Sequence, residues 1–303
     1  MKSALSERVW NILACSYCEA NLERTSQGAR CRSCGLEYSY TDSGALDLRL
    51  KKEKKYSLEF DLDAIPFPAD NSTFLPLKLN PKPEIDLSHL RVPRHLTKEM
   101  LSYFPKARSP ESLMLDLGCG GGIHKGVSES AGFEWVGLDY ESDGAQILGD
   151  VRSLPFGDDT FEFILCVTVL QYVRNPFVMM REVNRVLKPG GKFIGTVAFL
   201  EPSHGTSFYH HTHLGTFNSL RSGGFTVESV APSDKWSVLH ALPSMGMFPG
   251  LPRALAQSIV FPLQLVHRLW WRLAGLAAGR NLEHLRIRNF AGSFTFIASK
   301  PAE

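Results

Sequence analysis

Residues 115–122 read Leu-Asp-Leu-Gly-Cys-Gly-Gly-Gly, and this stretch decides the interpretation of the fold. Apolar residues at 113–115 lead into an acid, Asp116, and then into a turn with glycines at alternate positions: Gly118, Gly120 and Gly122. This pattern is typical of a buried strand that ends in a tight turn around a ligand, because glycine lets the backbone approach the ligand closely. We therefore expect an α/β fold with a ligand at the end of this strand.

The residues of the turn distinguish two kinds of ligand. A dinucleotide-binding turn needs another glycine where this chain has Ile123. The carboxylate of Asp116, two residues before the first glycine, would repel a pyrophosphate but suits a ligand that carries an ammonium and a sulfonium group. The turn therefore favours S-adenosylmethionine as the ligand.

Four later stretches strengthen this interpretation, at residues 135–139, 149–156, 161–166 and 185–191. Together with the turn they resemble, in order, the motifs of the class I S-adenosylmethionine-dependent methyltransferases, in particular the subfamily of the ubiquinone and menaquinone biosynthesis enzymes. Ordered matches are far more specific than a single glycine-rich turn. The resemblance implies a doubly wound, mostly parallel seven-stranded sheet and a methyl-transfer activity.

The resemblance also implies which residues hold the cofactor. Asp116 and the three glycines of the turn would hold the methionine part, and Asp139 would hold the ribose hydroxyls. Asp150 would accept a hydrogen bond from the adenine amino group, beside the apolar wall of Val151. Cys166 ends the fourth strand near the cofactor, where we expect its thiol to be a small packing group.

Four of the six cysteines form two Cys-x-x-Cys pairs, which consist of Cys15, Cys18, Cys31 and Cys34. Each pair can place two thiolates on one turn, and two pairs complete the tetrahedron that zinc prefers. The spacing therefore predicts a zinc ribbon over residues 1–50, for which a purely structural role is favoured. Such a short segment would depend on the metal to fold.

Composition divides the rest of the chain. Residues 51–110 are rich in proline, which predicts a linker and an extended wrap on the catalytic domain. Residues 111–303 then form the methyltransferase domain. It carries an apolar, basic insertion at 235–290, in which no Asp or Glu occurs between Lys235 and Leu282. As a helix, residues 253–272 would place their arginines and glutamines on one narrow face, with a kink at Pro262.

That insertion is open to three interpretations. It fits a membrane interface, a lid over a lipid-like substrate, or a helical subdomain packed on its own core. A transmembrane helix is not expected, because no charge-free stretch has spanning length without Pro or Gly. Met1 to Trp10 lack the apolar core of a signal peptide, so we expect a cytoplasmic protein, with contact to the inner face of a membrane left open.

The loop after the fifth strand should face the transferred methyl group, and it contains four histidines. One of them could deprotonate the acceptor, and we place His211 and His213 ahead of His204. A metal site or histidines bonded only within the loop are the alternatives. The favoured acceptor is a small hydrophobic or lipid-linked molecule, methylated on oxygen.

Two other functions compete with this one. The ribbon also resembles modules of ribosomal-RNA guanine methyltransferases, which would make RNA the substrate. The net charge of +2 and the mixture of Arg and Glu on the ribbon argue against nucleic acid as a partner. A scaffold that kept the fold without activity is the third interpretation, and it predicts no cofactor binding.

Overall fold

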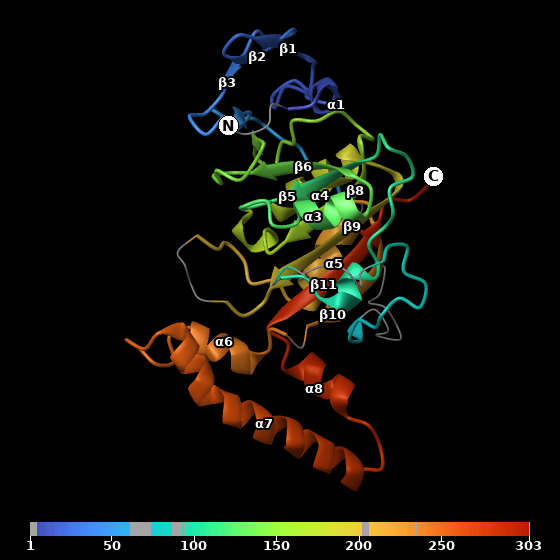
Figure 1. Ribbon diagram of the computed structural model, residues 1–303, viewed down its shortest axis with the longest axis vertical. Helices are drawn as coiled ribbons and strands as arrows, with labels where there is room; N and C mark the ends of the chain where they lie inside the picture. Colours follow the sequence, from blue (N-terminus) through green and yellow to red (C-terminus); the bar gives the residue numbers. More distant parts are fainter. Residues whose placement is uncertain are drawn as a thin grey trace.

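The computed structural model describes residues 5–60, 74–86, 93, 95–201, 206–233 and 235–302. An eight-stranded sheet in the order β10-β11-β9-β8-β5-β6-β7-β4 organises them (Figure 1). Its parallel part consists of β4 (Leu46–Asp47), β5 (Leu113–Leu117), β6 (Glu134–Asp139), β7 (Ile147–Leu148), β8 (Phe161–Val167) and β9 (Leu187–Ala198). The antiparallel end consists of β10 (Thr226–Pro232) and β11 (Ser293–Ser299). The predicted doubly wound, mostly parallel α/β fold is confirmed.

The eighth strand, β4, comes from the segment assigned to the zinc ribbon and was not among the seven strands expected. Leu46 pairs with Ile147 of β7, and the amide of Leu48 donates to the carbonyl of Leu148 at 2.8 Å. Without β4, the outer edge of β7, which has two residues, would expose backbone groups without partners. The N-terminal segment covers this edge.

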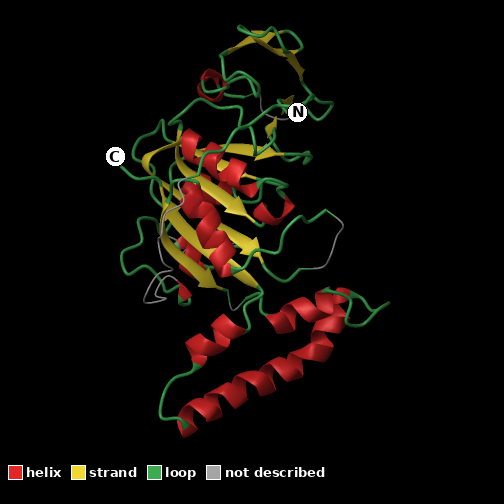
Figure 2. Ribbon diagram, turned by 180° about the vertical axis from the view of Figure 1, so that it is seen from behind, coloured by secondary structure: helices red, strands yellow, loops and turns green. Residues whose placement is uncertain are grey.

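Helices cover both faces of the sheet, as the two opposite views show (Figures 1 and 2). On one face, α2 (Lys98–Leu101) and α3 (Lys125–Ser130) share a buried cluster that contains Met100, Val127 and Phe163. On the other, α4 (Pro176–Val186) and α5 (His213–Ser222) belong to a larger cluster with β5, β8 and β9. Parallel strands buried on both faces are expected to be apolar throughout, as β5 and β8 are.

The N-terminal module lies at one end of the sheet (Figure 1). It consists of α1 (Glu7–Asn11) and an antiparallel sheet of β1 (Leu22–Thr25), β2 (Gly28–Cys31) and β3 (Glu37–Ser39). Its apolar residues do not form a core of their own, because Trp10, Leu13 and Tyr38 belong to the cluster that fills one face of the main sheet. The amide of Ala14 also donates to the carbonyl of Pro155 at 3.0 Å.

The insertion forms three helices at the opposite end of the sheet from this module (Figure 1). They are α6 (Val238–Ser244), α7 (Arg253–Ala277) and α8 (Glu283–Asn289). Pro262 lies inside α7, which remains one helix. Among the described residues, none of the helices has the combined length and apolar character that a membrane span requires.

Candidate active site

A cavity of about 560 Å³ opens at the carboxyl ends of the central parallel strands. β5 pairs with β6 on one side and with β8 on the other, so the chain reverses its direction of winding here. This switch point is where doubly wound sheets bind ligands. The lining comes from the turn after β5, the ends of β6 and β8, the segment after β7, a 3₁₀ helix at Leu170–Tyr172 and the loop before α5.

The glycine turn forms one wall of the cavity through Gly118. Gly118 has a φ of +73°, and a Cβ on it would lie 2.2 Å from Cγ2 of Val169, which also lines the cavity. A side chain at this position would therefore push Val169 out of place. Gly120 and Gly122 also have positive φ angles, but neither lines this cavity.

Asp116 lies beneath the turn and is fully buried. One ring nitrogen of His124, Nδ1, lies 3.2 Å from each carboxylate oxygen, and the indole nitrogen of Trp135 donates to Oδ2 at 3.1 Å. The carboxylate is thus satisfied by buried partners, and it does not line the cavity. These contacts fix the turn from below, while the expected contact of Asp116 with the cofactor stays a prediction.

Asp139 ends β6 at the cavity wall. Its Oδ2 accepts a hydrogen bond of 2.9 Å from the amide of Gly120, and its Oδ1 accepts from the amides of Glu141 and Ser142 at 3.1 Å. The acid therefore ties the glycine turn to the loop after β6. A carboxylate offers about four acceptor positions, so one remains for a ligand hydroxyl.

Asp150 and Val151 line the same cavity beyond the short third strand. The side chain of Arg152 holds the Asp150 carboxylate through two hydrogen bonds, at 3.0 Å from Nε and 2.7 Å from Nη2. The sequence interpretation foresaw the acid here but not this bidentate partner. The pair fixes the position of the carboxylate at the cavity wall, and its expected bond to adenine stays a prediction.

Cys166 is fully buried near the end of β8 and does not line the cavity. Burial raises the pKa of its thiol, and the nearby charge of Asp116 raises it further. A thiol that resists ionisation is a packing group rather than a nucleophile, in line with the expectation.

The two histidines proposed as bases do not line the cavity. His211 is 7% exposed, and its Nε2 has no hydrogen-bond partner among the described residues. Burial lowers its pKa, which keeps the imidazole neutral, while a hydrogen bond to the backbone of Leu170 acts in the opposite sense. His213 begins α5 and packs against the ring of Phe74 with ring centroids 4.7 Å apart. His204 lies outside the described residues.

A tyrosine of the cavity lining contacts a buried acid, and the sequence interpretation assigned neither residue. Tyr172 lines the cavity, and its hydroxyl lies 3.5 Å from Oε2 of Glu201. Glu201 is 7% exposed, and its other oxygen accepts a hydrogen bond of 2.9 Å from Ser207. Burial and the charge of Glu201 raise the pKa of Tyr172. The position of Glu201 directly after the fifth strand was the available signal.

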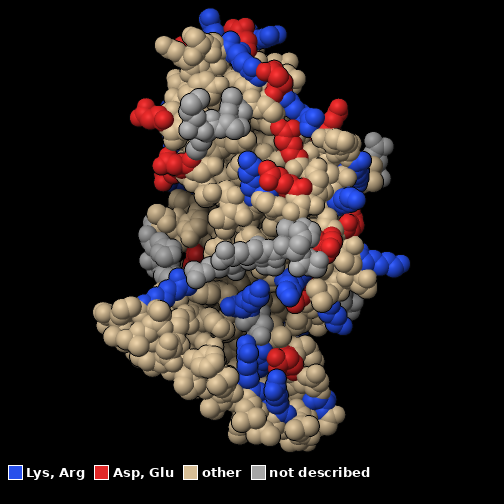
Figure 3. Space-filling view, viewed as in Figure 1, with Lys and Arg blue, Asp and Glu red and all other residues tan. Residues whose placement is uncertain are grey.

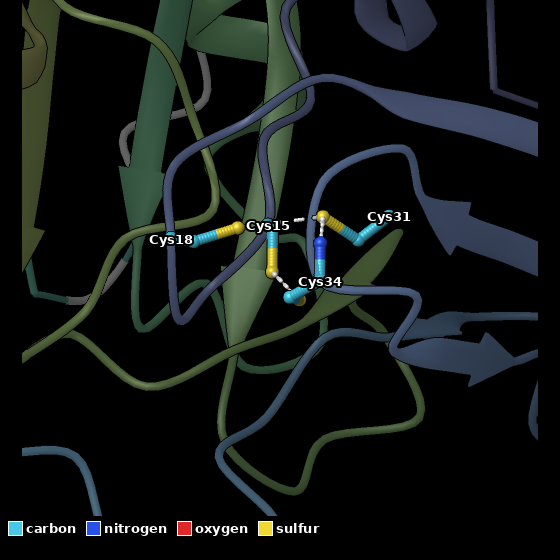
Figure 4. A group of neighbouring side chains, drawn as sticks. All are labelled: Cys15, Cys18, Cys31 and Cys34. Atoms are coloured by element: carbon cyan, nitrogen blue, oxygen red, sulfur yellow. Dashed lines mark hydrogen bonds between the residues drawn. The ribbon is translucent and has the colours of Figure 1, made fainter.

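The four cysteines of the N-terminal module converge (Figure 4). The sulfurs of Cys15 and Cys34 are 3.7 Å apart, those of Cys18 and Cys31 are 3.4 Å apart, and all four lie within 4.8 Å of one another. Sulfurs bound to zinc at about 2.3 Å in a tetrahedron are about 3.8 Å apart. The cluster is therefore compatible with zinc.

Two groups of known proteins resemble this chain. A Caenorhabditis elegans protein named sterol 4-C-methyltransferase strm-1 is 33% identical over 98 residues, which cover 26% of this chain and 29% of that protein. The demethylmenaquinone methyltransferase of Renibacterium salmoninarum is 31% identical over 107 residues, which cover 32% of this chain and 45% of the relative. The chain spans less than half of the length of either relative.

The solved structures that resemble the chain include an S-adenosylmethionine-dependent methyltransferase from Mesorhizobium loti. It shares 16% sequence identity, with a TM-score of 0.44, over 66% of this chain and 95% of that one. Residues 115–195 match a protein family described as the methyltransferase domain, and they contain the glycine turn, Asp139 and Asp150. Residues 115–195 therefore resemble a methyltransferase domain, and they lie within the doubly wound α/β sheet described above.

Proposed function

We propose that the protein is an S-adenosylmethionine-dependent methyltransferase that acts on a small hydrophobic or lipid-linked acceptor. The observation that carries the proposal is the cavity at the switch point, which brings Gly118, Asp139 and Asp150 to one wall. Gly118 lets the side chain of Val169 pack against the turn at the cavity wall, and the two acids carry the acceptor atoms that ribose and adenine require. These residues fit the cofactor.

Each part of the site has a separate task in this proposal. S-adenosylmethionine supplies a methyl group that its sulfonium already activates, so the protein needs mainly to align the reactants and exclude water. Asp139 accepts a hydrogen bond from a ribose hydroxyl, and Asp150, held by Arg152, accepts one from the adenine amino group. Val151 packs against the base.

The acceptor side of the cavity is aromatic. Tyr172 and Phe208 line it and are 41% and 49% exposed, and Tyr209, 45% exposed, is bonded through its hydroxyl to the carbonyl of Arg174 in the same wall. Exposed aromatic groups around a cavity favour an apolar ligand. The names of the two relatives above, which refer to a sterol and to demethylmenaquinone, support the same class of acceptor.

We propose oxygen as the methylated atom, because groups suited to hold a hydroxyl proton line the cavity or belong to the loop that follows β9. Glu201 with Tyr172 forms one such pair, and the neutral imidazole of His211 is the other candidate. In either case the acceptor oxygen forms a bond to the methyl carbon, the carbon–sulfur bond breaks, and the acceptor proton passes to the protein or to water.

Titration calorimetry with S-adenosylhomocysteine, the expected product, tests the proposal. One-to-one binding is expected, and Asp139→Ala should weaken it about 10- to 100-fold, since one hydrogen bond to a charged group contributes about 1.5–3 kcal/mol. The matched control is Asp143→Ala, which removes an exposed acid from the same loop and should leave affinity unchanged. Absence of binding by the wild-type protein would defeat the enzyme proposal and favour the scaffold.

The class of acceptor is tested with radiolabelled cofactor. The purified protein is incubated with a lipid extract and, separately, with RNA, and the labelled product is identified by mass spectrometry. Label in RNA would establish the rival function. The ribbon gives that rival little support, because Arg24 is paired with Glu7 at 2.6 Å and Arg32 lies 3.9 Å from Glu23. A product methylated on carbon would refute the proposal of O-methylation alone.

We further propose that the cysteine cluster holds a structural zinc ion. Buried Cys15 and Cys31 face exposed Cys18 and Cys34, and no open position for a substrate is needed in a four-thiolate site. Elemental analysis should find one zinc per chain. A protein that contains no zinc after purification without chelators, yet is folded, would contradict this assignment.

A further inference from the structure

The long helix of the insertion, α7, presents an apolar face to the outside of the molecule. Large side chains along this face, which we call the outer face of α7, are between 48% and 70% exposed: Leu255, Ile259, Val266, Leu269, Trp270 and Leu273. A surface helix normally buries its apolar stripe and exposes its polar one. An apolar face of this length requires a covering partner.

The opposite side of α7 is where the helix uses its polar groups. Gln264 is buried and donates to the carbonyl of Leu239 at 3.3 Å. Gln257 donates to the carbonyl of His240 at 2.7 Å and to the hydroxyl of Ser244 at 3.1 Å. The helix is thus held on α6 by satisfied hydrogen bonds through its glutamines. Its orientation is fixed by these contacts, which leave the apolar side outward.

Arginines are the main charges near the outer face. Arg268 and Arg272 are exposed on the flank of α7 next to its glutamines, where their charges lower the pKa of Glu283, and the sequence contains no acid from Lys235 to Leu282. The next acid, Glu283, is held by Arg286 at 2.7 Å. Figure 3 shows a broad uncharged surface over this part of the molecule, with Lys and Arg far outnumbering acids. Apolar side chains beside arginines are the composition of helices that lie in an anionic lipid surface.

The insertion leaves the sheet at the carboxyl ends of the parallel strands, where the active-site cavity also opens. It joins β10 to β11, and Ser293 at the start of β11 pairs with Ala198 at the carboxyl end of β9. The indole of Trp236 donates to the carbonyl of Leu200 at 2.6 Å, which ties the base of the insertion to this edge. A surface bound by α7 therefore lies on the side of the molecule from which a ligand enters.

We propose that the outer face of α7 docks the protein on an anionic membrane surface, with the apolar side chains among the acyl chains and the arginines at the lipid phosphates. A second copy of the chain is a poorer occupant. Two such faces packed together would bring Arg268 and Arg272 close to the same residues of the other copy, and the acid whose pKa they lower, Glu283, is already paired with Arg286.

Flotation of the full-length protein with vesicles tests this surface independently of catalysis. Vesicles of phosphatidylcholine alone are compared with vesicles that contain about one-third phosphatidylglycerol, at low and high salt. The variants are Arg268→Gln/Arg272→Gln and Leu269→Ser/Leu273→Ser. The controls, away from the insertion, are Arg32→Gln on the ribbon and Leu79→Ser, which are both exposed. Sedimentation gives the oligomeric state of each protein.

We expect binding to the anionic vesicles that weakens with salt. The double arginine variant should bind about 30-fold more weakly, at about fivefold for each charge. The double serine variant should lose on the order of 100-fold, and both controls should bind like wild type. Wild-type protein that stays in the soluble fraction with anionic vesicles at low salt would overturn the proposal. A dimer that the serine substitutions dissociate would overturn it as well, by assigning the face to a second copy.

Discussion

The conformation of Gly118 leads to a prediction whose size follows from the structure. Gly118 and Gly120 both have positive φ angles, +73° and +51°, at which an L-residue costs about 1–2 kcal/mol. Their surroundings differ, because a Cβ at Gly118 would lie 2.2 Å from Cγ2 of Val169, whereas nothing lies within 4 Å of one at Gly120. Alanine substitutions at these two glycines therefore separate the free-energy cost of backbone strain from the cost of a steric clash.

Gly120→Ala should lower the free energy of unfolding by the strain alone, about 1–2 kcal/mol. Gly118→Ala should lower it by the same amount plus the overpacking cost of displacing a partly buried valine, about 1–3 kcal/mol. Because Val169 lines the cavity, Gly118→Ala should also weaken the binding of S-adenosylhomocysteine. Gly126→Ala, in α3 with nothing within 4 Å, provides a control of opposite sign, since alanine favours a helix by about 1 kcal/mol.

Urea unfolding measures these free energies, and calorimetry measures the affinity of the folded variants. Val169→Ala should partly restore the stability and affinity of Gly118→Ala, because it removes the clashing methyl groups. The double-mutant cycle would then give a coupling energy of about 1 kcal/mol or more. Equal destabilisation by Gly118→Ala and Gly120→Ala, with no coupling to Val169, would refute the reasoning.

Three further predictions concern the metal, the acid in contact with Tyr172 and pH. Removal of zinc by a chelator should lower cofactor affinity as well as stability. The Ser153 hydroxyl donates to the Ser16 carbonyl at 2.5 Å and so links the cysteine module to the proposed adenine wall of the cavity. Calorimetry on the metal-free protein measures the change in affinity. Glu201→Gln should reduce kcat more than it changes KM for the acceptor, and Tyr172→Phe should do the same if the two act as a pair. Burial lowers the pKa of His211, so below about pH 6.5 the unfolded chain binds a proton at this residue more readily than the folded protein does. The free energy of unfolding should therefore fall as the pH drops below about 6.5, and it should fall less in His211→Gln. Denaturant titrations at several pH values measure the difference.

The sequence was informative wherever a pattern reflects local backbone requirements. Alternating glycines after an apolar run predicted the turn and the strand before it. The cysteine spacing predicted a cluster that the structure confirms. In each case the signal lies within a few residues of the feature that it predicts.

Features that depend on distant partners were not predictable in the same way. The strand at Leu46–Asp47 exists because a short strand about one hundred residues later needs an edge partner, which no local pattern reports. The bidentate Arg152 beside Asp150 and the pair of Tyr172 with Glu201 depend on the direction of side chains. For α7, periodicity predicted the helix and its polar stripe but not which side faces the protein. That side is set by α6, whose backbone carbonyls accept hydrogen bonds from the glutamines of α7.

The two additions to the methyltransferase domain lie at opposite ends of the sheet (Figure 1), and each contacts a segment that leads to a different half of the cavity. The cysteine module contacts the segment after the third strand, where Asp150 and Val151 form the proposed adenine wall. The insertion is anchored to the end of β9, next to Glu201. If each acts on the half to which that segment leads, metal removal should change cofactor affinity, whereas substitutions on α7 should change access of a membrane-borne acceptor and leave cofactor affinity unaltered. Cofactor affinity and acceptor turnover on vesicles can be measured for the metal-free protein and for the α7 variants. A loss of cofactor affinity in the α7 variants would contradict the assignment of the insertion to acceptor access alone.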